Sequence, residues 1–122
     1  MGERPFPFVP RRSKELLAGD LWSIPLSDGR FACGRVLGHA EPSTTGATVS
    51  FTGGLHDWVA DQPPNSQSIS GAAICNVGRV HVAAIAAGGG AVVGHRGLDL
   101  DGIECPSTVS HYWGDGYAKA RA

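Results

Sequence analysis

Hydrophobic and polar residues alternate in short runs along most of the chain, and turn-forming residues separate these runs. The first two runs cover residues 21–26 (LWSIPL) and 31–37 (FACGRVL), and the segment Ser-Asp-Gly-Arg lies between them. Asp-Gly is a strong hairpin signal, because a two-residue type I′ turn needs positive φ at both central positions. The pattern therefore predicts a β-hairpin with Asp28 and Gly29 as its two turn residues.

A two-residue turn also determines which residues of the hairpin face each other. It places Ile24 opposite Cys33 and Trp22 opposite Arg35, all on the apolar side of the pleat. A cation over an indole ring contributes about 0.5–2 kcal/mol. The sequence thus predicts that the Arg35 guanidinium packs against the Trp22 ring at the open end of the hairpin.

Further strands are predicted over residues 47–52, ended by Gly53-Gly54, and over 69–76, 77–85, 91–94 and 111–113. Ser13 begins a short helical turn, residues 61–68 form a polar loop, and the alanine-rich run 83–87 is compatible with either a strand or a helical turn. Many short strands between turn signals predict a mainly β fold, a small SH3-like or partly open β-barrel with one or two short helices. The alternative is an α+β fold with a bent antiparallel sheet.

A chain of 122 residues fits one domain, which we place at residues 13–122 after a flexible, proline-rich N-terminal arm over 1–12. Ten Lys and Arg against eleven Asp and Glu give a net charge of −1, which is not the basic footprint of a nucleic-acid-binding protein. The three cysteines show no CxxC pairing, and no apolar run reaches the length of a membrane span. These features predict a cytoplasmic protein without nucleic-acid or membrane partners.

Motifs of catalysis and metal binding are not complete in the sequence. The triplet at 88–90 lacks the residues of a phosphate-binding loop, the five histidines lack zinc-ligand spacing, and no GxSxG is present. A Cys75–His81 dyad is conceivable, although a buried cysteine more commonly acts as a small hydrophobic residue. We therefore predict no catalytic residue, metal or cofactor, and favour a binding protein over an enzyme.

Residues 17–37 resemble the opening of the immunity protein 26 family of bacterial polymorphic toxin systems. The resemblance is carried by Gly19-Asp20, Trp22, Ile24-Pro25-Leu26, Asp28-Gly29 and Gly34-Arg35-Val36, in this order. Turn and core roles account for most of these positions, so we regard Gly19, Asp20, Trp22, Asp28, Gly29, Gly34 and Arg35 as structural.

The resemblance implies a protein that binds and neutralises a cognate toxin by occluding its active site, without catalysis. The alternative is a looser resemblance to the barrel of MazF-type ribonuclease toxins. In that case Arg30 and Arg35 would be the basic groups near the RNA substrate. A generic peptide-binding β-barrel is a second alternative. Since many nuclease toxins are basic, exposed polar loop residues are candidate toxin contacts, namely Asp57, Asp61, Asn65, Asp99 and Asp101.

Overall fold

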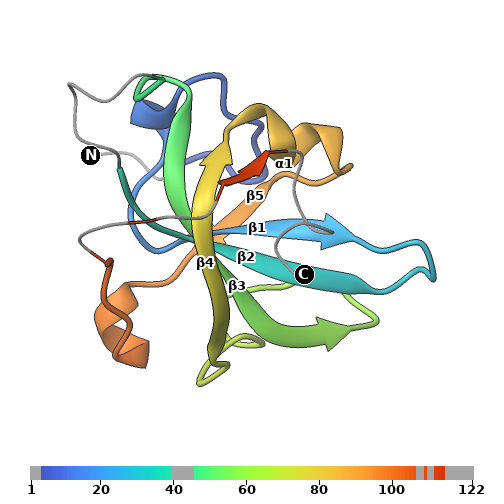
Figure 1. Cartoon of the computed structure of the whole chain (residues 1–122). Coiled ribbons are helices and arrows are strands. Elements are labelled where there is room, and N and C mark those ends of the chain that lie inside the picture. Colours follow the sequence, from blue (N-terminus) through green and yellow to red (C-terminus); the bar gives the residue numbers. More distant parts are fainter. Residues whose placement is uncertain (1–3, 40–45, 107–108, 110–111, 115–122) are drawn as a thin grey trace.

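The computed structural model describes residues 4–39, 46–106, 109 and 112–114, which form a twisted, bent sheet (Figure 1). Six strands are arranged in the order β5-β1-β2-β3-β4-β6. Neighbouring strands are antiparallel except β4 and β6, which are parallel. The strands are β1 Asp20–Pro25, β2 Phe31–His39, β3 Ser50–Ala60, β4 Ile74–His81, β5 Val92–His95 and β6 Tyr112–Gly114, and the helices are η1 Ser13–Glu15, α1 Ala83–Ala87 and η2 Leu98–Asp101.

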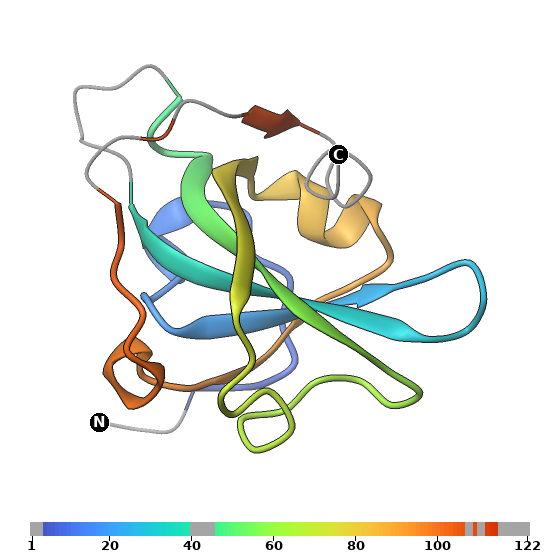
Figure 2. The same cartoon turned by 60° about the horizontal axis from the view of Figure 1, so that its bottom comes forward.

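The predicted mainly β class is confirmed. The sheet does not close into a barrel, because β5 and β6 remain its two edges within the part of the chain that the structure describes. Figure 2 shows the long strands β2, β3 and β4 crossing the molecule, with α1 next to one end of β4. Among the described residues, no helix is long and apolar enough to cross a membrane.

The predicted hairpin joins β1 to β2, but its register differs by one residue from the predicted one. Trp22 pairs with Gly34, and Arg35 pairs with Leu21. Because side chains alternate between the two faces of a strand, a slip of one residue moves Arg35 to the face opposite Trp22. The predicted Trp22–Arg35 pair and its cation–π contact are therefore wrong.

The loop of this hairpin explains the slip. The Gly29 amide donates to the Leu26 carbonyl at 3.1 Å, and the Leu26 amide donates to the Arg30 carbonyl at 2.8 Å. Only Gly29 takes a positive φ, of 88°, so residues 27–29 form a three-residue loop rather than a two-residue type I′ turn. The Asp28 carboxylate accepts a hydrogen bond from the Arg30 amide at 3.0 Å, which stabilises this loop. The Asp-Gly pair predicted the hairpin correctly but not its loop length.

The glycine pair Gly53-Gly54 does not end the third strand as predicted. It lies inside β3, where Gly53 pairs with Val36 on one side and Gly78 on the other. A Cβ atom at Gly53 would lie 2.8 Å from a methyl group of Val80 and 3.0 Å from the indole of Trp22. Glycine here makes room for side chains above the sheet instead of breaking the strand.

The two strands predicted over 69–76 and 77–85 are replaced by the single strand β4. The stretch 83–87 is the short helix α1, which settles the open choice between strand and helix. The predicted turn at Ser13 is the 3-10 helix η1, yet the Ser13 hydroxyl makes no cap and donates to the Ala47 carbonyl at 2.7 Å. Of the predicted last strand, Tyr112 and Trp113 lie in β6, and His111 lies outside the described residues.

The sheet carries apolar clusters on both faces. The larger cluster contains Trp22 and Phe51, whose rings meet edge to face at a centroid distance of 5.4 Å. The smaller cluster lies on the other face and contains Leu21 and Cys33. Two covered faces explain why few positions of β1 and β2 are exposed. The other buried members of the larger cluster are Leu16, Val36, Leu55, Val80, Val82, Ile85, Val92 and Trp113.

Residues 4–12, the predicted arm, contact the β5 edge of the sheet. Phe8 and Val92 exchange two backbone hydrogen bonds, of 3.0 and 2.8 Å, in an antiparallel bridge. This bridge satisfies backbone groups that an edge strand otherwise leaves open. The division of the chain into an arm and a single domain at residue 12 stays a prediction.

Candidate functional site

A fully buried arginine, Arg35, lies on the face of the sheet opposite Trp22 and is surrounded by acceptors. It donates to the carbonyls of Gly19 at 3.0 Å and Arg96 at 2.5 Å, and to the Asp101 carboxylate at 3.2 Å. A buried charge is tolerated only when it is paired and hydrogen-bonded in this way. Arg35 therefore holds the segments around Gly19, Arg96 and Asp101 together from inside.

His56 also belongs to this interior site and is 2% exposed. Its Nε2 lies 3.2 Å from Nη1 of Arg35, and its Nδ1 lies 3.0 Å from the Ala72 carbonyl. Burial, together with the charge of Arg35, lowers the pKa of His56, which favours the neutral ring. In the neutral ring, the tautomer that fits both neighbours has Nδ1 donating to Ala72 and Nε2 accepting from Arg35.

Asp101 connects η2 to the loop over residues 61–73. Its carboxylate accepts two hydrogen bonds from Arg96, at 2.8 and 3.2 Å, and one from the Gly71 amide at 3.2 Å. The Arg96 hydrogen bonds are the largest influence that lowers the pKa of Asp101 to about 2. Arg96 also donates to the Ser66 carbonyl at 3.2 Å. We call Arg35, His56, Arg96 and Asp101 the internal ion cluster.

A second buried carboxylate, Asp20, ties down the N-terminal residues. Arg4 donates to its two oxygens at 2.5 and 2.7 Å, and Nδ1 of His95 lies 2.9 Å from one of them. The Arg4 guanidinium also lies 5.3 Å from the centre of the Phe6 ring, within cation–π range. Asp20 thus links β1, β5 and the residues that precede η1.

The five candidate toxin contacts occupy two kinds of environment. Asp57 on β3, Asp61 directly after β3 and Asp99 in η2 are exposed. Asn65 is also exposed, but its side-chain oxygen accepts the amides of the residues two and three positions later, at 2.9 Å each. The Asp101 carboxylate is only 3% exposed and belongs to the internal ion cluster. The structure therefore leaves three of the five with exposed carboxylates.

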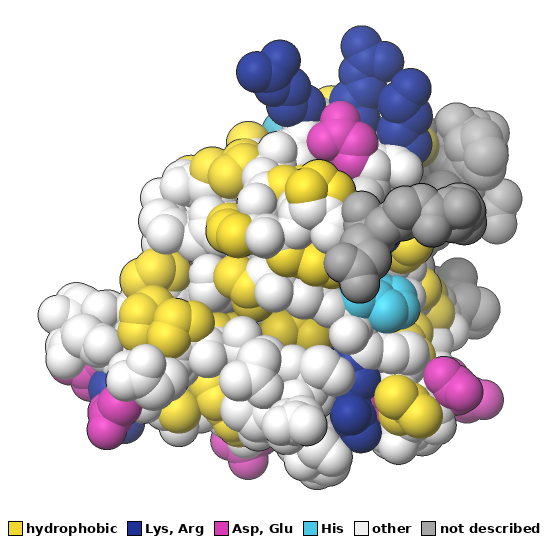
Figure 3. Space-filling model, turned by 180° about the vertical axis from the view of Figure 1, so that it is seen from behind, with side chains coloured by type: hydrophobic (Ala, Val, Ile, Leu, Met, Phe, Trp, Pro, Cys, Tyr) yellow, Lys and Arg dark blue, Asp and Glu magenta, His cyan; other side chains and the backbone are white. Residues whose placement is uncertain are grey.

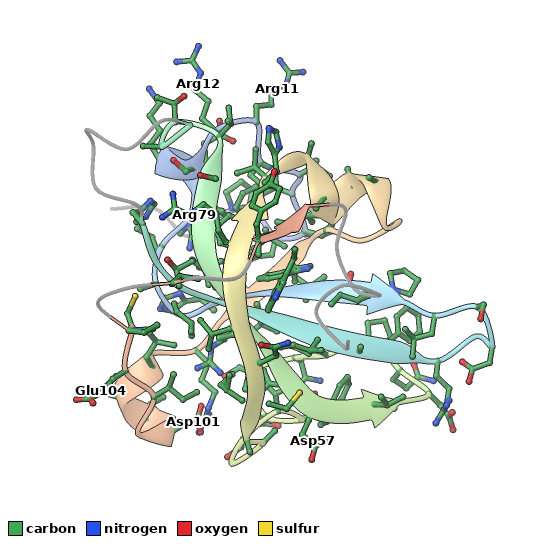
Figure 4. The ribbon with its side chains drawn as sticks, viewed as in Figure 1. Arg11, Arg12, Asp57, Arg79, Asp101 and Glu104 are labelled. Atoms are coloured by element: carbon green, nitrogen blue, oxygen red, sulfur yellow. The ribbon has the colours of Figure 1, made fainter. Side chains whose placement is uncertain are left out.

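Charges of opposite sign lie at opposite ends of the molecule. Figure 4 shows Arg11 and Arg12 at one end, and Asp57, Asp101 and Glu104 at the other. In the view from behind (Figure 3), basic side chains gather at the first end around an acidic one, and acidic side chains lie along the second end with basic side chains between them. We use the name acidic end for the exposed carboxylates of Asp57 and Glu104 at this second end, together with those of Asp61, directly after β3, and Asp99, in η2 with Asp101.

A pocket of about 440 Å³ lies between the β1–β2 hairpin and the last residues of β3. Its walls come from residues 25–28 and Arg30, from residues 55–59 and from Cys75 in β4. The sequence did not predict this pocket, nor the participation of His56 and Arg96 in the internal ion cluster. The residues of the internal ion cluster come from distant parts of the sequence, so no local motif connects all of them. The one sequence feature that pointed to Arg96 was its place at the end of the segment VVGHR, which resembles the immunity protein 26 family.

The structure does not assemble the conceivable cysteine–histidine dyad. Cys75 and His81 lie near opposite ends of β4, six positions apart along a strand, which corresponds to about 20 Å. Cys33 is buried, and burial raises the pKa of its thiol to about 12, so this thiol is not a nucleophile. Among the described residues, no three His, Cys, Asp or Glu side chains converge as metal ligands do.

The burial of Arg35 also counts against the ribonuclease alternative. A group that binds RNA phosphates must reach the surface, and Arg35 is 0% exposed. Arg30, the other arginine of the hairpin, is exposed but forms an ion pair with Asp28 at 2.8 Å. Arg35 therefore does not reach the surface as the alternative requires, and Arg30 reaches it only as the partner of Asp28.

The protein-family model described as immunity protein 26 matches residues 18–114. The chain belongs to the immunity protein 26 family. The matched stretch begins just before β1 and ends at β6, so it contains every strand of the described residues. The resemblance carried by residues 17–37 is thereby confirmed. No curated protein matches the chain, and no solved structure matches it either. Membership of immunity protein 26 supports an immunity role in a toxin system.

Proposed function

We propose that this protein binds a cognate bacterial toxin and neutralises it by covering the toxin's active site. The observation that carries the proposal is the family match, because it spans almost the whole described fold. Neutralisation of this kind needs no catalyst, only a surface that is complementary to the toxin. The dispersed cysteine and histidine residues are in keeping with a protein that acts by binding.

The acidic end is the contact surface that we propose. Its exposed carboxylates at Asp57, Asp61 and Asp99 have no basic side chain bound to them among the described residues. A surface of one charge sign accelerates association with a partner of the opposite sign by about 10-fold to 1,000-fold at low salt. The proposed partner is therefore a toxin with a basic surface around its active site.

Asp101 and Asn65 have a different role in this proposal. Asp101 holds η2 against the loop over 61–73, and Asn65 closes a turn within that loop. Both act as positioning residues that fix the backbone carrying Asp61 and Asp99. We expect their substitution to affect stability first and toxin binding only as a consequence.

The first experiment is co-expression of the protein with the toxin domain encoded beside its gene, followed by measurement of growth and of the affinity of the purified pair. We expect restored growth and a direct complex. A toxin that remains active in the presence of excess folded protein would overturn the proposal.

The second experiment tests the acidic end. A variant with Asp57→Asn, Asp61→Asn and Asp99→Asn should associate with the toxin about tenfold more slowly at low salt. The matched control carries Arg11→Gln and Arg12→Gln, which remove charge from the opposite end. Equal association rates for the two variants would show that the acidic end is not the contact surface.

A further inference from the structure

The pocket beside the acidic end is lined by apolar and polar side chains, and Asp57 belongs to this lining. Pro25 and Leu26 contribute from the hairpin, Val59 from β3, and Cys75 from β4. Its volume of about 440 Å³ falls within the range of about 300–1,000 Å³ that is usual for pockets that enclose a ligand. The pocket is therefore large enough to receive a side chain of a partner protein.

Asp57 supplies the unpaired charge of this lining. Its side chain is exposed and forms no ion pair among the residues that the structure describes. The other charged groups of the lining, Asp28 and Arg30, form an ion pair with each other at 2.8 Å and cancel. The lining thus presents one uncompensated negative charge next to apolar surface.

We propose that this pocket receives a lysine or arginine side chain of the toxin. Such side chains lay their methylene groups along apolar surface while the charged head remains in a polar environment. Here the methylene groups would contact Pro25, Leu26 and Val59, and the head would pair with Asp57. This inference rests on the proposed function, because it specifies which type of toxin side chain contacts the acidic end.

The natural cysteines provide a test of the location without any mutation. Cys75 lines the pocket and is exposed, whereas Cys105 is exposed elsewhere, beside Gly38. N-Ethylmaleimide alkylation of each thiol is followed by peptide mass spectrometry, with and without the toxin domain encoded beside the gene. With that domain at about ten times its Kd, we expect Cys75 to react about tenfold more slowly and Cys105 at an unchanged rate.

A charge series tests the occupant. Asp57→Asn should weaken toxin binding about tenfold, and Asp57→Lys should weaken it further because it places a positive charge in the lining, facing a positively charged occupant. Glu104→Gln is the matched control, since it removes an exposed carboxylate of the acidic end that does not line the pocket. Thermal unfolding of each variant verifies that the fold is intact.

The outcomes separate this inference from the proposed function. Absence of any complex with the wild-type protein would overturn both. A complex that leaves Cys75 as reactive as in the free protein would overturn the pocket as a contact while leaving the proposed function in place. Protection of Cys75 together with unchanged affinity of Asp57→Asn and Asp57→Lys would overturn a basic occupant.

Discussion

Asp101 gives the sharpest prediction about how the fold is held together. The substitution Asp101→Asn keeps the size of the side chain but removes the negative charge that Arg35 and Arg96 share. Removing one partner of a buried ion pair costs about 3–5 kcal/mol, because the remaining charge is left uncompensated. An asparagine oxygen still accepts one hydrogen bond, so we expect a loss of about 3 kcal/mol in the free energy of unfolding at pH 7.

The loss should depend on pH in a defined window. The pKa of Asp101 falls from its ordinary value of 3.8 to about 2 in the folded protein, a difference worth about 2 kcal/mol at 1.36 kcal/mol per pH unit. A carboxyl group with a lowered pKa stabilises the fold fully above its unfolded pKa and loses that contribution as the pH falls toward its folded pKa. The wild-type advantage over Asp101→Asn should therefore narrow by about 2 kcal/mol between pH 5 and pH 2.

Urea unfolding of both proteins, followed by tryptophan fluorescence at several pH values, measures this difference. The matched control is Asp99→Asn, two positions away in η2 and exposed, which should change stability by less than about 0.5 kcal/mol. A penalty for Asp101→Asn that stays constant from pH 7 to pH 2 would refute the account of Asp101 as an ionised, internally paired carboxylate.

Two further predictions concern other parts of the fold. In Gly34→Ala the added methyl group would overlap the Trp22 indole, so the free energy of unfolding should fall by about 1–3 kcal/mol. The control is Gly94→Ala, whose Cβ would meet only Leu21 atoms at 3.9–4.0 Å and which should lower the free energy of unfolding less. Equal losses for the two variants in chemical unfolding would contradict the packing of Gly34 against Trp22. Arg4→Met removes the guanidinium that pairs with both oxygens of the buried Asp20 carboxylate and should lower the midpoint of thermal unfolding. A midpoint equal to that of the wild type at pH 8 would show that Arg4 does not stabilise the fold.

The sequence was sufficient to predict the mainly β class and the first hairpin, because alternation and the Asp-Gly pair are local signals. It was not sufficient for the register. Asp-Gly also fits a three-residue loop in which only Gly29 has positive φ, and that one-residue difference decides whether Arg35 lies beside Trp22 or inside with Asp101. Local patterns do not distinguish the two loops when both put apolar residues on a buried face.

The candidate site was predictable only in part, for a related reason. Asp57, Asp61 and Asp99 are exposed, as acidic residues in polar segments usually are. Asp101 looks the same in the sequence, but its partner Arg35 is 66 positions away in β2. A long-range ion pair leaves no periodicity or spacing in the sequence, so the internal ion cluster emerged only with the tertiary structure.

The placement of the internal ion cluster has a consequence for how such a protein diversifies. The charges that hold η2 against the loop over 61–73 point inward, while the carboxylates of Asp61 and Asp99 are exposed on the same two segments. Replacement of an outward carboxylate leaves the fastening untouched. Under the proposed function, exposed residues of the acidic end can therefore change one at a time during evolution while the buried contacts that hold the fold are kept.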